Sequence, residues 1–236
     1  MNRLLELSAL GARETMLAQS INSHNLANAS TPGFRKDLMT YTGTVLDGGV
    51  KTGIDLAPGT VQGTGKALDV AITGPGYFAI QTPEGGEAYS RRGDFKLDAQ
   101  GQLTNGVGNP VFGEGGPIAL PPHSDLVIGG DGTISIRPLG EQANALQVVD
   151  RLRLVNVDEA QLEKGFDGYL RLPPGQIPDA DGAVKVVSGA LESSNVNPVE
   201  SMVRMIDLAR KFESHIKIMS TAKENETKLN QIMKFN

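Results

Sequence analysis

The sequence predicts an α+β protein. Two long terminal helices are expected to pair as a coiled coil, and a Gly-rich central all-β domain, barrel-like or sandwich-like, lies between them in the chain. Of 29 glycines, only Gly11 and Gly33 precede residue 34 and none follows Gly189, so the ends suit helices and the middle suits turns. Both ends carry apolar residues at helical spacing, whereas the middle alternates apolar and polar residues.

The C-terminal end predicts one long helix. Asn197 is a typical N-cap residue, Pro198 suits the first helical position, and Glu200 suits the first turn. Neither Gly nor another Pro follows. Apolar residues recur at alternating steps of three and four, at Met202, Met205, Ala209, Phe212, Ile216 and Met219. This spacing is typical of a coiled-coil seam.

The N-terminal end predicts a second amphipathic helix. Its apolar face comprises Leu4, Leu7, Leu10, Leu17 and Ile21. Pro32 and Gly33 end the helix, because proline disfavours helical backbone at the preceding residue. An apolar stripe of this length needs a partner. The simplest partner is the other terminal helix, and the next simplest is a neighbouring copy of the chain.

The middle of the chain predicts short strands joined by tight turns. Leu68–Ile72 and Tyr77–Ile80 read as strands, and the segments 126–128 and 133–136 flank a Gly-rich turn. The resulting organisation is an N-terminal helix, an extended connector, a central β domain and a C-terminal helix, at residues 1–33, 34–66, 67–189 and 190–236. The first and last of these segments together form the inner coiled-coil domain.

The composition excludes several classes of protein. A net charge of -5 leaves no basic surface that could follow a phosphate backbone, so no nucleic-acid partner is expected. The absence of Cys excludes disulfides and thiolate metal sites. No apolar run reaches the roughly 18 residues of a transmembrane helix. The first residues lack an apolar signal region, so neither stable membrane insertion nor a cleaved secretory signal is expected.

The sequence carries no motif typical of an enzyme. The interval from Gly59 to Gly65 is one residue too long for a phosphate loop, and Lys66 is not followed by Ser or Thr. The three histidines lack metal-binding spacing. A glycosidase carboxylate pair stays open, because sequence alone does not give the separation of two carboxylates. We therefore expect no catalytic residues, no cofactor and no metal.

Three asparagines, Asn22, Asn25 and Asn28, end the N-terminal helix. They fit two interpretations. Asparagine is common at fraying helix ends, where its amide caps the backbone. Alternatively, a row of amides hydrogen-bonds a neighbouring molecule at an apolar interface and fixes its register.

Three stretches resemble signatures of the bacterial flagellar rod and hook protein family. Asn25–Phe34 resembles the N-terminal signature. Leu68–Phe78 and Tyr89–Phe95 resemble the central β signature, and Gly189–Val196 resembles the start of the C-terminal one. The stretches lie in the expected order and together span nearly the whole chain. The short length and the segment Gly113–Ile118 are most similar to proximal rod members, with distal rod members as the nearest rival.

The resemblance implies a structural protein. Members of the family leave the cell through the flagellar type III export apparatus without a cleaved signal. Copies assemble helically with other rod proteins into a drive shaft that spans the periplasm and transmits torque. The resemblance implies no cofactor and no small-molecule substrate. Two alternatives stay open, namely a distal rod or hook-type axial protein and a secreted glycan-binding β module.

The assembly contacts expected from these patterns are of two kinds. The packing residues of the inner layer are Leu10, Leu17, Ile21, Met202, Met205, Phe212, Ile216 and Met219. The residues expected to set register between neighbours are Asn25, Asn28 and Asn195.

Overall fold

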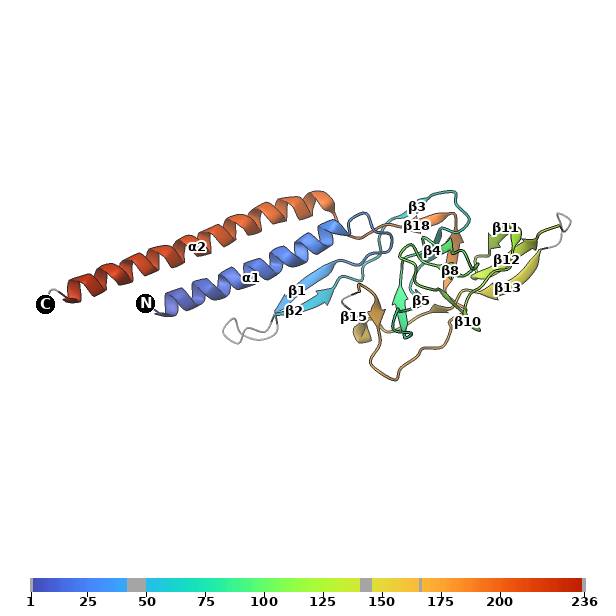
Figure 1. Ribbon diagram of the computed structural model, residues 1–236, viewed down its shortest axis with the longest axis horizontal. Helices are drawn as coiled ribbons and strands as arrows, with labels where there is room; N and C mark the ends of the chain where they lie inside the picture. Colours follow the sequence, from blue (N-terminus) through green and yellow to red (C-terminus); the bar gives the residue numbers. More distant parts are fainter. Residues whose placement is uncertain (1, 42–49, 141–145, 166, 235–236) are drawn as a thin grey trace. The chain divides into compact units, whose positions relative to one another are not determined.

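The structure is a computed structural model that describes residues 2–41, 50–140, 146–165 and 167–234 (Figure 1). The chain forms two compact units, each built from separated segments. Unit 1 comprises Met1–Ala29, Lys36–Asp55 and Val196–Asn236, and unit 2 comprises Ser30–Arg35 and Leu56–Asn195. The chain therefore passes between the units after residues 29, 35, 55 and 195.

Both expected terminal helices are confirmed. They are α1 (Asn2–Ala27) and α2 (Pro198–Lys234). Helix α2 begins as the sequence predicts, because Asn197 Oδ1 accepts hydrogen bonds from the backbone N–H groups of Val199 at 3.0 Å and Glu200 at 3.2 Å. These bonds satisfy two of the donors that every helix N-terminus leaves without a partner in the helix.

In unit 1, α1 lies between α2 and a β-hairpin (Figure 1). The hairpin consists of β1 (Asp37–Tyr41) and β2 (Val50–Ile54), paired antiparallel from Asp37 opposite Ile54. Both strands fall within the segment 34–66 that was expected to be an extended connector, and residues 42–49 of that segment lie outside the described residues. The hairpin gives α1 a second packing partner.

The largest sheet of unit 2 is antiparallel and five-stranded. Phe78 and Ile80 of its β5 are fully buried, so this sheet carries much of the core. Its strands in spatial order are β14 (Leu154–Val155), β5 (Tyr77–Gln81), β6 (Glu87–Ser90), β16 (Leu170–Arg171) and β15 (Glu163–Lys164).

A three-stranded antiparallel sheet contains β11 (His123–Ile128), β12 (Thr133–Pro138) and β13 (Gln147–Arg151). The expected turn between its first two strands is confirmed, with Gly132 at a φ of 87°. That backbone conformation is strained for residues with a Cβ, which explains the glycine. One face of this sheet is buried, through Leu126, Ile128, Ile134 and Ile136.

The remaining strands of unit 2 form antiparallel pairs, and one short 3₁₀ helix, η2, covers Glu159–Gln161. The pairs are β4 (Val70–Thr73) with β17 (Lys185–Ser188), β3 (Val61–Gly63) with β18 (Ala190–Glu192), β7 (Lys96–Leu97) with β8 (Leu103–Thr104), and β9 (Phe112–Gly113) with β10 (Gly116–Pro117).

The core of unit 2 joins several of these small sheets. The rings of Phe78 and Phe95 meet edge to face, with centroids 5.1 Å apart. Gly93 allows close approach, because a Cβ built on it would lie only 1.7 Å from the carbonyl oxygen of Val70. Side chains rather than one continuous hydrogen-bond ladder therefore hold these sheets together.

The prediction of a barrel-like or sandwich-like β domain is wrong. The described strands form several small separate sheets, and none of these closes into a barrel. Closure requires long strands that keep their register around the ring. Many strands here are two residues long, and glycines at positive φ, such as Gly76 and Gly101, turn the chain before a longer ladder can form.

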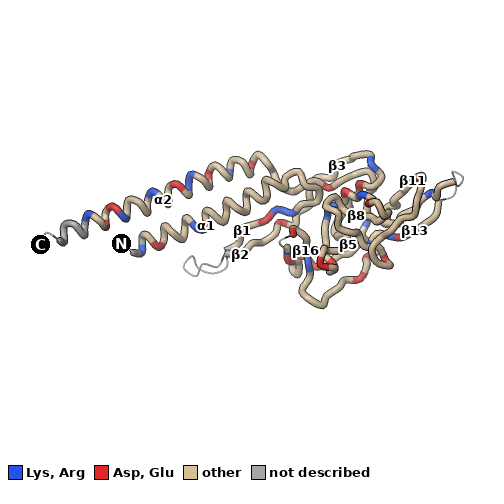
Figure 2. The backbone as a smooth tube through the Cα atoms, in the orientation of Figure 1, with Lys and Arg blue, Asp and Glu red and all other residues tan. Residues whose placement is uncertain are grey.

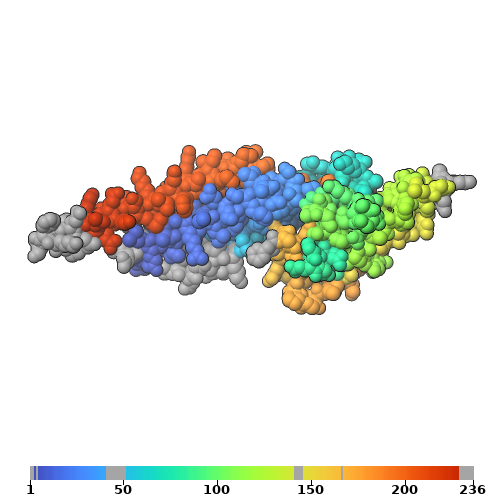
Figure 3. All heavy atoms as spheres, in the orientation of Figure 1, coloured from blue at the N-terminus to red at the C-terminus, as the bar shows by residue number. Residues whose placement is uncertain are grey.

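The predicted coiled-coil pairing is not shown either. Helices α1 and α2 contact each other along their length (Figure 3). However, the residues buried on α1 are small or polar rather than the leucines of the expected stripe, namely Ser8, Ala12, Thr15, Asn22 and Asn25. The rotation of α1 about its own axis therefore differs from that of the predicted seam.

Candidate assembly interface

The seam between α1 and α2 is narrow and mostly built from small side chains. On α2 the buried residues are Ser201, Leu208 and Ala222. Asn22, buried on α1, donates a hydrogen bond from Nδ2 to the carbonyl oxygen of Ser201 at 2.7 Å. Thr15 turns its hydroxyl back to the carbonyl oxygen of Gly11 at 2.7 Å. Small and internally bonded side chains let two helices approach closely but bury little apolar area.

A large apolar surface of α2 points away from α1. Val199, Met202, Val203 and Ile206 are each more than half exposed, and we call this set the outer patch. Their spacing of i, i+3, i+4 and i+7 places them on one face of the helix. No described residue of unit 1 covers this face. Contiguous exposed apolar faces of this kind are typical of protein interaction sites.

The predicted packing residues of α2 divide between these two surfaces. Met205, Phe212 and Met219 are half-buried, and they recur at the same helical spacing as Leu208 and Ala222 of the seam. Met202 belongs to the outer patch, and Ile216 is 45% exposed.

Of the predicted packing residues of α1, Ile21 lies beside the hairpin. Leu10 and Ile21 are half-buried, and Leu17 is 39% exposed. Ile21 lines a small cavity of unit 1 together with Leu38 and Met39 of β1. The hairpin thus takes up part of the apolar stripe that was expected to meet the other helix.

The asparagines make contacts within the chain. Asn25 binds the backbone of Asp37 twice, because its Nδ2 donates to the carbonyl oxygen and its Oδ1 accepts from the N–H, each at 2.8 Å. Asn28 donates to the carbonyl oxygen of His24 at 2.9 Å. In unit 2, Asn195 donates to the carbonyl oxygen of Ala57 at 3.0 Å. These bonds order the protomer, and contacts with a neighbour stay a prediction.

Charge is distributed differently on the two helices (Figure 2). Lys and Arg alternate with Asp and Glu along α2, whereas α1 has none of these residues from Thr15 to Ala27. At that end His24 Nδ1 lies 2.6 Å from Asp37 Oδ2. The outer patch is therefore an apolar surface on a helix of mixed charge, which favours contact with an apolar surface rather than with a polyanion.

Neither a metal site nor a membrane helix is present in the part of the chain that the structure describes. No group of three or more His, Cys, Asp or Glu residues is placed there to hold a metal ion. Neither described α-helix is long and apolar enough to cross a membrane.

Comparison with known proteins decides the family. Residues 187–232 match the family described as Flagellar basal body rod FlgEFG protein C-terminal, and residues 71–136 match the Flagellar hook protein FlgE/F/G D1 domain. The chain is 39% identical to the Flagellar basal-body rod protein FlgF of Escherichia coli strain K12, over 96% of both chains. The chain belongs to the flagellar FlgE/F/G rod and hook family.

Two further relatives support the same family. The FlgF protein of Salmonella typhimurium is also 39% identical over 96% of both chains. The Flagellar basal-body rod protein FlgG of Buchnera aphidicola from Schizaphis graminum is 33% identical, over 97% of this chain and 98% of that one. The expected resemblance to rod proteins is confirmed. Membership in this family makes the chain a structural protein of the flagellar basal body, which is not an enzyme class.

The two family matches fall on different parts of the structure. The C-terminal match includes β18 and most of α2, and with them the whole outer patch. The D1 match lies entirely within unit 2 and runs from β4 to β12.

Sequence reasoning missed three members of the outer patch, Val199, Val203 and Ile206. Their spacing was a usable signal, because together with Met202 it repeats as i, i+3, i+4 and i+7. It also missed the seam residue Ser8, for which an apolar pattern gives no signal at all.

Proposed function

We propose that this chain is a subunit of the proximal rod, which assembles helically with copies of itself and with other rod proteins into a torque-transmitting shaft. The outer patch is the surface through which the helices dock on a neighbouring subunit. The observation that carries this proposal is the exposure of Val199, Met202, Val203 and Ile206 on one face of α2.

The division of apolar residues on the helices supports docking. Burying a side chain such as Val203 contributes about 1.5–3 kcal/mol. Within one chain the four side chains of the outer patch stay exposed and therefore make no such contribution. The residues buried between α1 and α2 are mostly small. A head-to-tail contact that does not close on itself generates a helical filament. Leu17, Met202 and Ile216, the predicted packing residues that are exposed, take part in the same contacts.

The comparisons favour the proximal over the distal rod. Identity is 39% to the two relatives named FlgF from Escherichia coli and Salmonella typhimurium, and 33% to one relative named FlgG from Buchnera aphidicola. The proposal includes export through the flagellar type III apparatus without a cleaved signal, and a final location in the rod that spans the periplasm. It includes no catalytic activity.

The test replaces Val203 in a strain whose only copy of this protein is the variant. Val203→Asp places a charge in the outer patch, so we expect few or no copies of this chain in purified basal bodies and loss of swimming. Val203→Ile keeps an apolar side chain at the same position and should restore wild-type copy number. Quantitative mass spectrometry of basal bodies gives the count.

The outcomes separate the alternatives. A handful of wild-type copies per basal body supports a proximal rod subunit, whereas many copies indicate a distal rod or hook-type shaft protein. Wild-type copy number in the Val203→Asp strain would overturn docking through the outer patch. Absence of the wild-type chain from basal bodies, with a soluble monomer that binds peptidoglycan fragments, would favour the glycan-binding alternative. The melting temperature of unit 2 in each variant serves as the folding control.

A further inference from the structure

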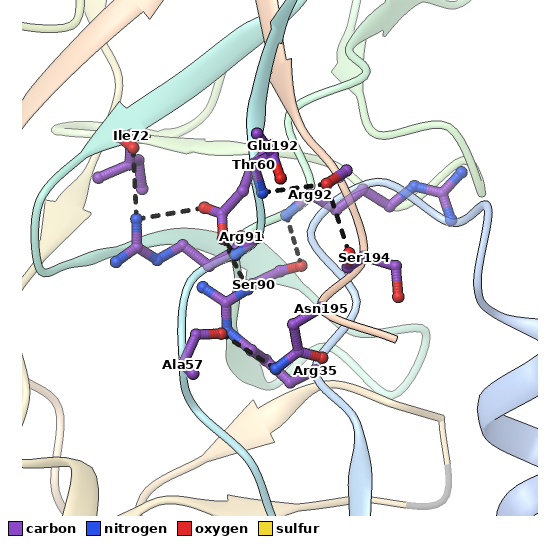
Figure 4. Close-up of polar contacts among 12 residues, drawn as sticks. Arg35, Ala57, Thr60, Ile72, Ser90, Arg91, Arg92, Glu192, Ser194 and Asn195 are labelled. Carbon is purple, nitrogen blue, oxygen red and sulfur yellow. Dashed lines mark hydrogen bonds and ion pairs between the residues drawn. The ribbon is translucent and has the colours of Figure 1, made fainter. Parts of the chain in front are cut away.

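The segments that connect unit 2 covalently to unit 1 converge on one buried side chain, Glu192 at the end of β18 (Figure 4). These connectors are residues 30–35, 56–60 and 190–195. The Glu192 side chain is 1% exposed. Acidic residues are almost never this buried unless they are paired, so the arrangement around Glu192 needs an explanation.

The Glu192 carboxylate binds groups from two connectors and from the core. Arg35 Nη1 lies 2.6 Å from Oε1, and Gly59 donates its backbone N–H to the same oxygen at 2.8 Å. Arg91, which follows β6, approaches Oε2 at 3.4 Å. The backbone carbonyl oxygen of Glu192 accepts from the N–H of Gly33 at 2.8 Å. One residue thus ties the first and second connectors to the third.

Further hydrogen bonds continue the same connection. Thr60 and Ser193 exchange two bonds, from Thr60 N to Ser193 Oγ at 3.0 Å and from Ser193 N to the Thr60 carbonyl oxygen at 2.8 Å. Asn195 donates its N–H to the carbonyl oxygen of Phe34 at 3.3 Å and its Nδ2 to that of Ala57 at 3.0 Å. The third connector is therefore bonded directly to each of the other two.

Two glycines allow the connectors to approach this closely. A Cβ built on Gly59 would lie 1.9 Å from the carbonyl oxygen of Ser193. A Cβ on Gly33 would lie 2.3 Å from the carbonyl carbon of Arg91, and the φ of Gly33 is 65°, which side chains also disfavour. The connectors are thus packed backbone against backbone around the carboxylate.

Arg91 anchors the connectors to the core of unit 2. It donates to the carbonyl oxygen of Gly74 at 2.6 Å, and its guanidinium lies 5.3 Å from the centre of the Tyr77 ring. Burial lowers the pKa of Arg91, and the neighbouring Glu192 opposes that shift. Two guanidinium groups share one carboxylate here, so removal of Glu192 leaves two buried cations without the carboxylate that pairs with both.

We propose that Glu192 is a positioning residue that locks the three connectors into one load-bearing joint, so that torque is shared among them. Arg35 and Arg91 hold its carboxylate. This proposal rests on the rod function proposed above. A peptide connector loaded singly would stretch, whereas connectors bonded to each other and to the core share the strain.

The wild-type protein gives the first test, through native-state hydrogen exchange on the full chain. If the connectors form one joint, the amides of Gly33, Gly59, Ser193 and Asn195 open together with one common free energy. Unrelated opening free energies for the three connectors would overturn the proposal. This measurement needs no variant and stands even if substitutions at Glu192 prevent folding.

The second test is Glu192→Gln, with Glu163→Gln as its control. Glu163 is exposed on β15 of the same unit, so the control makes the same chemical change without touching the joint. In Glu192→Gln we expect exchange at Gly33 and Gly59 to rise about a hundredfold, because one buried charge partner is gone. Exchange at Ile80 in the core should stay at the control rate. An equal rise at Ile80 would show general destabilisation and contradict the proposal.

The third test applies load. Both variants replace the wild-type chain in motile cells, which swim in buffer and in a medium of high viscosity. If the connectors share load, both variants should swim equally well in buffer. At high viscosity only cells with Glu192→Gln should swim more slowly or have broken rods. Equal swimming under load, together with loosened connectors, would overturn the load-bearing role. Failure of the wild-type chain itself to restore motility would contradict the rod function instead, so the two failures are distinguishable.

Discussion

The imidazole of His215 lies in a notch that Gly11 leaves on α1. A Cβ built on Gly11 would lie 2.5 Å from Cε1 of His215 and 2.9 Å from Nε2. His215 recurs on α2 at the spacing of the seam residues Leu208 and Ala222. Shape rather than apolar area therefore fixes how far the two helices can approach at this point.

The first prediction concerns Gly11→Ala. Helix propensity alone would make alanine stabilising by about 1 kcal/mol. The added Cβ would clash with the His215 ring, and the clash costs more than the gain in helix propensity. We therefore expect Gly11→Ala to lower the stability of unit 1 by about 1 kcal/mol. Thermal unfolding followed by helical circular dichroism measures it.

The control for that prediction is the same change in a His215→Ala background. With the ring removed, Gly11→Ala should stabilise the helices. If Gly11→Ala has the same effect in both backgrounds, His215 does not occupy the notch in solution.

The second prediction concerns Asn25. Its side-chain amide makes two hydrogen bonds with the backbone of Asp37, as a neighbouring strand would. Asn25→Ala removes both of these hydrogen bonds, each of which contributes about 0.5–1.5 kcal/mol. Hydrogen exchange at the Asp37 amide should accelerate strongly. Ser20→Ala, a change at an exposed position of the same helix, should leave that amide unchanged. Equal exchange in the two variants would mean that Asn25 does not hold the hairpin.

The third prediction compares the two partners in the buried ion cluster. Glu192→Gln leaves two guanidinium groups without the carboxylate that they share, so the free energy of opening the connectors should fall by about 3 kcal/mol. Arg35→Gln leaves Arg91 and Glu192 as a balanced pair and should cost only about 1–3 kcal/mol. Native-state hydrogen exchange at Gly33 and Gly59 in each variant gives both values. A larger loss for Arg35→Gln would contradict this assignment of charges.

The fourth prediction concerns alkaline pH. Burial, with a smaller contribution from Glu159, raises the pKa of Tyr77 above its ordinary value of 10.0, and burial also raises the pKa of Tyr89. The neutral phenols are therefore favoured in the folded state, and their full contribution to stability is present below the unfolded pKa. This contribution is lost as the pH rises from about 10 through the folded pKa of each tyrosine.

Absorbance titration of tyrosinate tests the alkaline prediction. Tyr77 and Tyr89 should ionise at a higher pH than an exposed tyrosine. The Tyr77→Phe variant should lack one of the ionisation steps that occur at high pH. The variant should also lose less stability between neutral and alkaline pH than the wild type. Ionisation of Tyr77 at its ordinary pKa in the folded protein would show that water reaches its phenol.

The local features of this protein follow from local sequence. Asn197 and Pro198 start α2 where the capping pattern places its first turn, because a cap is made by neighbouring residues. The turn before Thr133 is equally local, since only glycine adopts the φ of Gly132 easily. The family could be recognised from the sequence alone, because few other families would carry three such motifs in this order over the whole chain.

Long-range packing decided the rest. Leu17 looks like a core residue by periodicity and Ser8 does not, yet α1 buries Ser8, because close approach at the seam requires small side chains. The strand pattern did not reveal that short strands would stay in separate sheets, since pairing partners lie far apart in the chain. Glu192 shows the same limit: its ion pair with Arg91 spans 101 residues, and only the tertiary structure brings a second guanidinium to the carboxylate. Local sequence sets the backbone conformation of a segment, whereas the burial of a side chain depends on which residues from distant parts of the chain pack against it.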